Sequence, residues 1–252
     1  MTTALITGAS SGIGLEIARI LAPRHDLVLV ARSAAKLDAL ATELGGARVI
    51  AADLSDPSAV AKITAEIADV DVLVNNAGVG DFGAFAEADT DRTLAMIQLN
   101  ITSLTALTRA YLPGMLARGS GRVMNVASTA SFQPGPLMAV YYATKAYVLS
   151  FSEALTEETR GSGVTVTALC PGPTASGFQA AADMELSPLV ANKKLPTSAE
   201  VAAFGVKAME KGDAVAVPGL LNKVMAAGVR VTPRPVMRRL VHKLQTTKPA
   251  KD

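Results

Sequence analysis

The sequence predicts an α/β protein: a doubly wound parallel sheet of about seven strands with helices on both faces, folded as a single domain. Apolar runs of four to six residues alternate with longer stretches of helical periodicity along the 252-residue chain. A repeated strand–helix–strand order implies right-handed crossovers, which place helices on both faces of a parallel sheet. Half of the residues are hydrophobic and 18% are charged, which excludes intrinsic disorder and supplies a large core.

Seven strands and six helices are expected before residue 220. The strands are expected near Thr3–Ile6, Leu27–Ala31, Ala47–Ala51, Val70–Val74, Arg122–Val126, Val164–Leu169 and Ala214–Val217. The helices are expected near Gly12–Ala22, Ala34–Leu44, Pro57–Ala68, Asp91–Ala117, Val140–Thr159 and Ala199–Glu210. Ser33 and Asp56 are candidate N-caps, and Pro57 suits a first helical position. Thr197 and Glu200 match a capping box.

Composition and the N-terminal residues exclude several classes of protein. The N-terminus has no basic region and no cleavage site, so it is interpreted as the first strand and not as a signal peptide. No run of eighteen or more apolar residues is present, so no transmembrane helix is expected. Cys170 is the only cysteine, which is typical of a reducing cytoplasm. Only His25 and His242 could join it, so we expect no metal site.

A glycine-rich turn follows the first expected strand and opens the first helix, in the segment Thr7–Gly14. Gly8 permits a tight turn, Gly12 lets the backbone approach a phosphate, and Gly14 lets the helix pack closely on the strand. The N–H groups and the dipole at the start of a helix favour a pyrophosphate. Three glycines alone could be an ordinary loop, but the strand before them and the helix after them favour dinucleotide binding.

The end of the second strand favours NADP(H) over NAD(H). NAD-binding proteins of this architecture place an Asp or Glu about 20 residues beyond the glycines, where it bonds the ribose 2′-hydroxyl. This sequence has Ala31 at that position, followed by Arg32 and Ser33. A carboxylate would repel a 2′-phosphate, whereas a guanidinium can bind it in bidentate fashion. The alternative for Arg32 is a solvated surface residue.

A tyrosine and a lysine with helical spacing form a candidate for acid–base chemistry. Of the four tyrosines, only Tyr141 has a lysine four residues later, Lys145. On a helix the two side chains share a face, and a nearby ammonium is expected to lower the phenol pKa from about 10. Such a pair also arises by chance in any helix. Ser128 follows a predicted strand, where a capping or turn hydroxyl is the alternative role.

Taken together and in this order, these motifs resemble the short-chain dehydrogenase/reductase family, which has a Rossmann-type fold. The resemblance runs from Thr3 to about Val217, and Ile13 also matches the cofactor signature. It implies an oxidoreductase that transfers a hydride between NADP(H) and a carbonyl or secondary alcohol, either a ketone reductase or a 3-oxoacyl reductase. A cofactor-binding sensor or scaffold without turnover is the alternative from another class.

The resemblance assigns four catalytic roles. Tyr141 is implied to be the general acid in reduction, and Lys145 to lower its pKa and bind the nicotinamide ribose. Ser128, thirteen residues before the tyrosine, is implied to orient the substrate oxygen, and Asn100 to anchor a proton-relay water. The complete set argues against the sensor, because a binding module needs no poised phenol.

The resemblance also assigns the cofactor contacts. Asp53 is implied to bond the adenine amino group, and the turn that ends at Gly78 to close over the cofactor. Either Thr174 or Ser176 is implied to bond the nicotinamide carboxamide. The expected cofactor-binding residues are Thr7, Gly8, Ser10, Ser11, Gly12, Ile13, Gly14, Arg32, Ser33, Asp53, Leu54, Asn76, Ala77, Gly78, Tyr141, Lys145, Pro171, Gly172, Thr174 and Ser176.

Two segments beyond these motifs are less well defined. The catalytic domain is expected to span residues 1–219 and to include a substrate lid near 177–196. The lid's apolar residues could form a pocket wall or could cover the core; they are Phe178, Met184, Leu186, Leu189 and Val190. Residues 220–252 are expected to form a helical extension with eight basic residues and one acidic residue, against 16 and 21 in residues 1–219.

The extension includes a candidate basic amphipathic helix, Pro233–Leu244. One side of that helix is expected to carry Val236, Met237, Leu240, Val241 and Leu244. It could contact anionic lipid, an acidic substrate or carrier, a subunit, or the protein's own core. Nucleic-acid binding is not expected, because no aromatic interleaving or binding module is present. Family members commonly form homodimers or homotetramers through long central helices, and the same is expected here.

Overall fold

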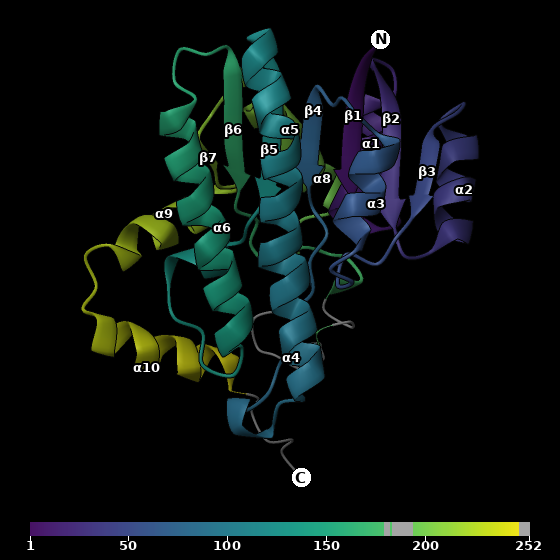
Figure 1. Ribbon diagram of the computed structural model, residues 1–252. Helices are drawn as coiled ribbons and strands as arrows, with labels where there is room; N and C mark the ends of the chain where they lie inside the picture. The colour runs from purple at the N-terminus through teal and green to yellow at the C-terminus, as the bar shows by residue number, and fades with distance from the viewer. Residues whose placement is uncertain (179–181, 183–193, 247–252) are drawn as a thin grey trace.

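Residues 1–178, 182 and 194–246 are described by a computed structural model, and they form one seven-stranded parallel sheet (Figure 1). The strand order is β3-β2-β1-β4-β5-β6-β7, which confirms the predicted doubly wound α/β fold. The strands are β1 Thr2–Thr7, β2 His25–Ala31, β3 Arg48–Ala51, β4 Val72–Asn75, β5 Gly121–Val126, β6 Val164–Leu169 and β7 Val215–Ala216.

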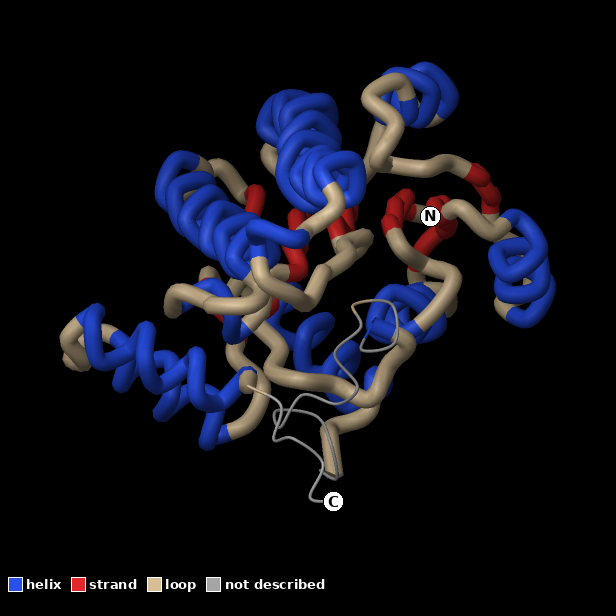
Figure 2. The backbone as a smooth tube through the Cα atoms, turned by 90° about the horizontal axis from the view of Figure 1, so that it is seen from below, coloured by secondary structure: helices blue, strands red, loops and turns tan. Residues whose placement is uncertain are grey.

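Helices cover both faces of the sheet, so that the strands lie between two helical layers in Figure 2. One face is covered by α1 Gly12–Leu21, α2 Ala34–Glu43 and α8 Ser198–Lys211. The other is covered by α3 Ala59–Glu66, α5 Leu104–Arg118 and α6 Ala139–Glu158. The remaining elements are η1 Phe85–Glu87, α4 Thr90–Ile97, η2 Gln98–Ser103, η3 Thr129–Phe132, α9 Leu220–Val229 and α10 Arg234–Gln245.

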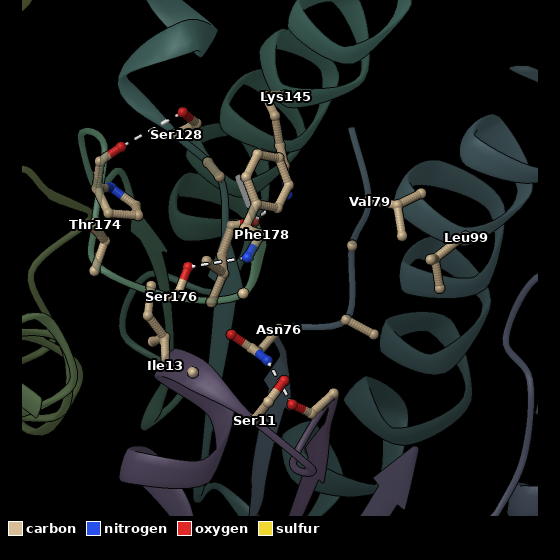
Figure 3. Close-up of a pocket in the computed structure, with 18 of the residues that line it drawn as sticks. Ser11, Ile13, Asn76, Val79, Leu99, Ser128, Lys145, Thr174, Ser176 and Phe178 are labelled. Atoms are coloured by element: carbon tan, nitrogen blue, oxygen red, sulfur yellow. Dashed lines mark hydrogen bonds between the residues drawn. The ribbon is translucent and has the colours of Figure 1, made fainter. Parts of the chain in front are cut away.

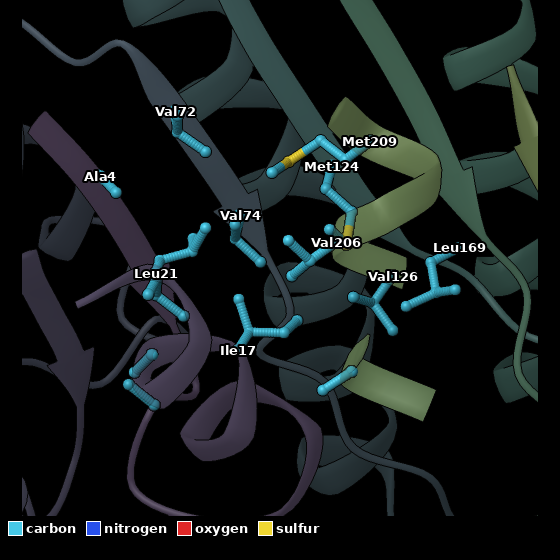
Figure 4. Packing of buried hydrophobic residues seen from close by; sticks show 14 of the residues in the cluster. Ala4, Ile17, Leu21, Val72, Val74, Met124, Val126, Leu169, Val206 and Met209 are labelled. Atoms are coloured by element: carbon cyan, nitrogen blue, oxygen red, sulfur yellow. The ribbon is translucent and has the colours of Figure 1, made fainter. Parts of the chain in front are cut away.

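Alternate residues of each strand supply the two halves of the core. In β1, Ala4 and Ile6 pack on the face covered by α1 and α8, whereas Leu5 packs on the opposite face. Successive strand residues point to opposite faces, so a strand buried on both faces is a continuous apolar run. Figure 4 shows the first half of the core, where helix residues meet the strands, including Ile17, Leu21, Val74, Met124, Val206 and Met209.

The direction in which strands are added reverses between β1 and β4. From β1 the chain proceeds outward through β2 and β3, and then returns to place β4 on the other side of β1. In open parallel sheets, ligands bind in the crevice at the carboxyl ends of the strands beside such a reversal. The fold therefore directs attention to the loops that follow β1 and β4.

The structure confirms two predicted caps and corrects two predicted helices. The Ser33 hydroxyl accepts a hydrogen bond from the Lys36 N–H, and Thr197 forms a capping box at the start of α8. Pro57 is not the first helical residue, because α3 begins at Ala59. The Asp56 carboxylate instead accepts the N–H of Ser58 at 2.8 Å, which makes a turn ahead of the helix.

The long helix expected over residues 91–117 is divided into three parts. Between α4 and α5 the chain forms a π-helical turn, η2, which contains Asn100. Turns of this kind are rare and often occur at functional sites. The hydrophobic periodicity could not predict this one, because both flanking segments remain helical.

Candidate active site

One cavity of about 490 Å³ lies at the carboxyl ends of the strands, beside the β1–β4 reversal. Figure 3 shows Ser11 and Ile13 at one end of it and Ser128 and Lys145 at the other. Most of the predicted site residues line it: Gly8, Ser10, Ser11, Gly12, Ile13, Arg32, Ser33, Asp53, Leu54, Asn76, Ala77, Gly78, Ser128, Tyr141, Lys145, Pro171, Gly172, Thr174 and Ser176. The structure therefore brings together residues from seven separate segments.

Three predicted residues, Thr7, Gly14 and Asn100, lie behind the cavity wall and shape it. The Thr7 hydroxyl accepts the N–H groups of Asn76 and Ala77, each at 3.0 Å, and so joins the end of β1 to the loop after β4. A Cβ on Gly14 would lie 2.4 Å from the Asn76 side-chain nitrogen, so only glycine fits there. These residues act on the cavity through the loops that they hold.

The glycine turn has the conformation that its sequence predicts. Gly8 and Gly12 adopt left-handed φ angles of 67° and 58°, which favour glycine. The Asn76 amide nitrogen donates to the carbonyls of Thr7 and Gly8 at 3.0 and 3.2 Å, which fixes the turn. Ser11 is the N-cap of α1 but makes no side-chain capping bond. The start of α1 therefore faces the cavity without a competing side chain, as suits an anion.

Cationic side chains line the cavity near the end of β2. Arg32 and Ser33 are there as predicted, and Lys36 from the first turn of α2 joins them. Among the described residues, neither Arg32 nor Lys36 makes an ion pair. Lys36 was not selected from the sequence, although its position four residues after Arg32, just inside the helix, is a usable signal. Asp53 lines the same region and accepts two bonds from Ser55, at 2.7 and 2.9 Å.

At the other end of the cavity, Ser128, Tyr141 and Lys145 line the wall together, and the Ser128 hydroxyl donates to the Pro171 carbonyl at 3.4 Å. The Ser128 hydroxyl also accepts the Ala130 N–H at 3.1 Å and caps η3, so its capping role and its place in the site coexist. The Lys145 ammonium donates to the Val126 carbonyl at 2.8 Å and lies 5.9 Å from the centre of the Tyr141 ring. The three side chains therefore share one end of the cavity.

Burial governs the pKa values of both Tyr141 and Lys145. Burial raises the pKa of the Tyr141 phenol to about 12, and the nearby Ser128 hydroxyl acts more weakly in the opposite direction. Burial lowers the pKa of the Lys145 ammonium to about 8. We expected the lysine to lower the phenol pKa. In the structure the phenol pKa is raised instead. Burial removes both groups from water, which disfavours the charged form of each.

Asn100 holds the loop after β4 from the π-helical turn. Its side chain accepts the Val79 N–H at 3.0 Å, donates to the Val79 carbonyl at 2.9 Å, and also donates to the Thr144 hydroxyl at 3.1 Å. A Cβ on Gly78 would lie 3.2 Å from both the Asn100 oxygen and the Lys145 nitrogen. These contacts assign Asn100 a positioning role beside the reacting end; the water that it was predicted to anchor stays a prediction.

The reacting end of the cavity is mostly apolar. The centres of the Phe178 and Tyr141 rings lie 5.3 Å apart, and Phe178, one of the residues predicted for the pocket wall, lines the cavity. Its other predicted members, Met184, Leu186, Leu189 and Val190, lie outside the described residues. Helix α9 adds Asn222 and Met225, which sequence reasoning missed because no local signal connects them to the distant motifs.

Two findings about absent features apply to the described part of the chain. Within residues 1–178, 182 and 194–246, no group of three or more His, Cys, Asp or Glu side chains is arranged to hold a metal ion. No helix in these ranges is long and apolar enough to cross a membrane.

The sheet, the glycine turn and the position of the cavity define a dinucleotide-binding protein of the doubly wound α/β class. The chain belongs to the short-chain dehydrogenase family, whose family model matches residues 2–186. It is 36% identical over 179 residues to the ketoacyl reductase HetN of Nostoc, a match that covers 68% of this chain and 62% of that protein.

Two solved structures extend the similarity to almost the whole chain. A short-chain dehydrogenase from Sphingobium yanoikuyae in complex with NADPH is 31% identical, with a TM-score of 0.82 and 99% of each chain covered. A bulky-bulky ketone specific alcohol dehydrogenase from Comamonas testosteroni is 28% identical, with a TM-score of 0.78, covering 99% of this chain and 97% of that one.

Proposed function

We propose that this protein is an NADP(H)-dependent reductase of a ketone or a 3-oxoacyl compound. The observation that carries the proposal is that one cavity joins a cationic end, with Arg32 and Lys36, to a reacting end with Ser128, Tyr141 and Lys145. A dinucleotide bound between these ends would place its phosphates at the glycine turn and its nicotinamide beside the phenol.

The residues present fit an NADP(H) cofactor. The uncapped start of α1 and the glycine turn suit the pyrophosphate. Arg32 and Lys36 suit a 2′-phosphate, because neither cation is engaged by a carboxylate among the described residues. Lys145 would hold the nicotinamide ribose, and Thr174 or Ser176 its carboxamide. The Sphingobium yanoikuyae relative is described in complex with NADPH, which supports the same choice.

The residues at the reacting end suit proton transfer to a carbonyl oxygen that accepts a hydride. When bound, NADPH supplies that hydride. With its pKa raised to about 12, the Tyr141 phenol is protonated at neutral pH and can donate to the forming alkoxide. Ser128 can hold the same oxygen in place. Lys145, with its pKa near 8, is largely protonated at neutral pH and can stabilise the tyrosinate left after transfer.

The apolar lining favours an uncharged or lipophilic carbonyl substrate. Val79, Met138, Tyr142, Phe178 and Met225 surround the reacting end. The names of two relatives, a ketoacyl reductase and a bulky-bulky ketone specific alcohol dehydrogenase, agree with that chemistry. Both substrate classes therefore belong in the first assay.

The test is the initial rate of NADPH oxidation, measured in parallel with NADH, on ketones, aldehydes, quinones and 3-oxoacyl thioesters. We expect turnover with NADPH on at least one ketone or 3-oxoacyl thioester. A clear preference for NADH would refute the role of Arg32, while tight NADPH binding without turnover on any class would favour the sensor alternative.

We also infer a homo-oligomer formed through the long helices. Leu94 on α4, Leu116 on α5 and Tyr147 on α6 are exposed, and Tyr147 stacks on Phe151 at 5.7 Å between ring centres. Burial of such side chains against a second copy is favourable. Light scattering coupled to size exclusion should give a dimer or tetramer, and a monomer at all concentrations would contradict the inference.

A further inference from the structure

Helices α9 and α10 expose an unusual number of large apolar side chains. They lie together at one edge of the molecule, beyond α6 (Figure 1). Of the thirteen large hydrophobic side chains that are exposed in the described part of the chain, eight belong to residues 220–244. They are Leu220, Leu221, Val224, Met225, Val231, Val236, Leu240 and Leu244. Isolated exposed apolar residues are normal on a protein surface. A group of them on two neighbouring helices instead indicates an interaction surface.

The helices that bear this apolar surface are also strongly basic. Residues 220–246 contain no Asp or Glu, and their six Lys and Arg residues are Lys223, Arg230, Arg234, Arg238, Arg239 and Lys243. A second copy docked through the same face would bring two basic helix pairs together, which opposes self-association. An acidic carrier protein could pair with the cations but offers no reason for the exposed leucines. A partner that is both anionic and apolar satisfies both features.

Helix α10 is anchored on one side, so its exposed side is a fixed feature of the fold. Met237 and Val241 are buried in the cluster that contains Tyr141, and the Gln245 amide donates to the Tyr142 hydroxyl at 2.9 Å. The sequence predicted a single apolar side. The structure divides it into this buried half and an exposed stripe with helical spacing, formed by Val236, Leu240 and Leu244.

Helix α9 contributes both to the exposed apolar surface and to the wall of the candidate active site. Asn222 and Met225 line the cavity, whereas Leu220 and Leu221, 79% and 73% exposed, face the solvent beside Val224. A partner bound to the outer side of α9 would therefore lie one helix away from the reacting end of the cavity, which is mostly apolar.

We propose that α9 and α10 dock this protein on an anionic phospholipid surface and bring the apolar end of the cavity next to the bilayer. The leucines and valines enter the acyl boundary while the cations attract the anionic headgroups, as in interfacial amphipathic helices. The corollary, that a lipophilic carbonyl reaches the cavity from the membrane, rests on the proposed function; the docking itself does not.

The test is sedimentation of the NADPH-loaded full chain with phosphatidylcholine vesicles and with vesicles of equal parts phosphatidylcholine and phosphatidylglycerol. We expect binding to the mixed vesicles that weakens with salt and is about tenfold weaker without the anionic lipid. An apolar variant, Leu220→Ser with Leu221→Ser and Val224→Ser, and a charge variant, Arg238→Gln with Arg239→Gln and Lys243→Gln, should each lose about tenfold.

A matched control replaces an exposed apolar residue outside both α9 and α10 and the inferred subunit interface, Phe85→Ser, and should bind like the parent. Equal binding to both vesicle types, or equal losses in the control, would overturn the proposal. So would conversion of an oligomer to monomer by the apolar variant, or a preference for an acidic acyl carrier over vesicles. Each variant is also assayed on a water-soluble ketone. Vesicle binding without turnover would refute the proposed reductase activity and leave the docking proposal standing. Turnover without vesicle binding would refute only the docking proposal.

Discussion

Gly78 provides a sharp test of the reacting end, because the space around it is set by two of the proposed functional side chains. A Cβ at this position would lie 3.2 Å from the Asn100 oxygen and 3.2 Å from the Lys145 nitrogen. The φ angle of Gly78 is not left-handed, so alanine can be accommodated by the backbone. In Gly78→Ala the Lys145 ammonium must therefore move by a few tenths of an ångström, against its 2.8 Å bond to the Val126 carbonyl.

The expected effect of Gly78→Ala is on catalysis more than on folding. A misplacement of about 1 Å can cost about 10²-fold in rate, so a smaller shift should lower kcat about tenfold. The assay is NADPH oxidation with the best ketone, together with urea unfolding of both proteins. Gly228→Ala is the control, since a Cβ there meets nothing within 4 Å. Unchanged kcat would refute the reasoning, as would a loss of stability large enough to account for the lower rate.

Three further predictions address charge, cofactor choice and the C-terminal helix. Burial lowers the pKa of Lys145 from 10.5 to about 8, so between these values the unfolded chain binds the additional proton and stability rises with pH. Relative to Lys145→Met, the free energy of unfolding of the parent should rise by about 3 kcal/mol between pH 7 and 10.5, and parallel curves in urea titrations would contradict this. Arg32→Ala should raise KM for NADPH about 10- to 100-fold and leave KM for NADH unchanged, because a charge-assisted contact to the 2′-phosphate contributes about 1.5–3 kcal/mol; equal effects on both cofactors would remove Arg32 from the site. Gln245→Leu should cost about 1–2 kcal/mol, because it leaves the Tyr142 hydroxyl buried without its donor, and adding Tyr142→Phe should recover part of the loss in urea unfolding. Simple additivity of the two changes would show that the hydrogen bond is not important.

Sequence reasoning works best where the cause of the structure is local. The strands are continuous apolar runs, and the caps at Ser33 and Thr197 depend on residues three positions away. The turn at Gly8 and Gly12 depends on left-handed φ angles that glycine tolerates. For this reason the strands, the doubly wound fold and the glycine turn followed from the printed chain, and the family resemblance supplied most of the site residues.

The features that escaped prediction depend on contacts between distant segments. The π-helical turn accompanies the bonds from Asn100 to Val79, 21 residues earlier in the chain. The α9 wall of the cavity, with Met225, depends on how the C-terminal segment returns to the site. The direction of the Tyr141 pKa shift depends on burial, which the spacing between Tyr141 and Lys145 does not contain.

The most direct test of the central claim is the NADPH oxidation rate of Tyr141→Phe beside the parent enzyme, on the best carbonyl substrate of the panel. Removing the phenolic hydroxyl removes the proposed proton donor and leaves the ring that packs on Phe178. The account predicts a loss of about 10²- to 10⁴-fold in kcat with NADPH binding retained. A variant that keeps most of its rate would show that the proton comes from another group, and would contradict the proposed mechanism.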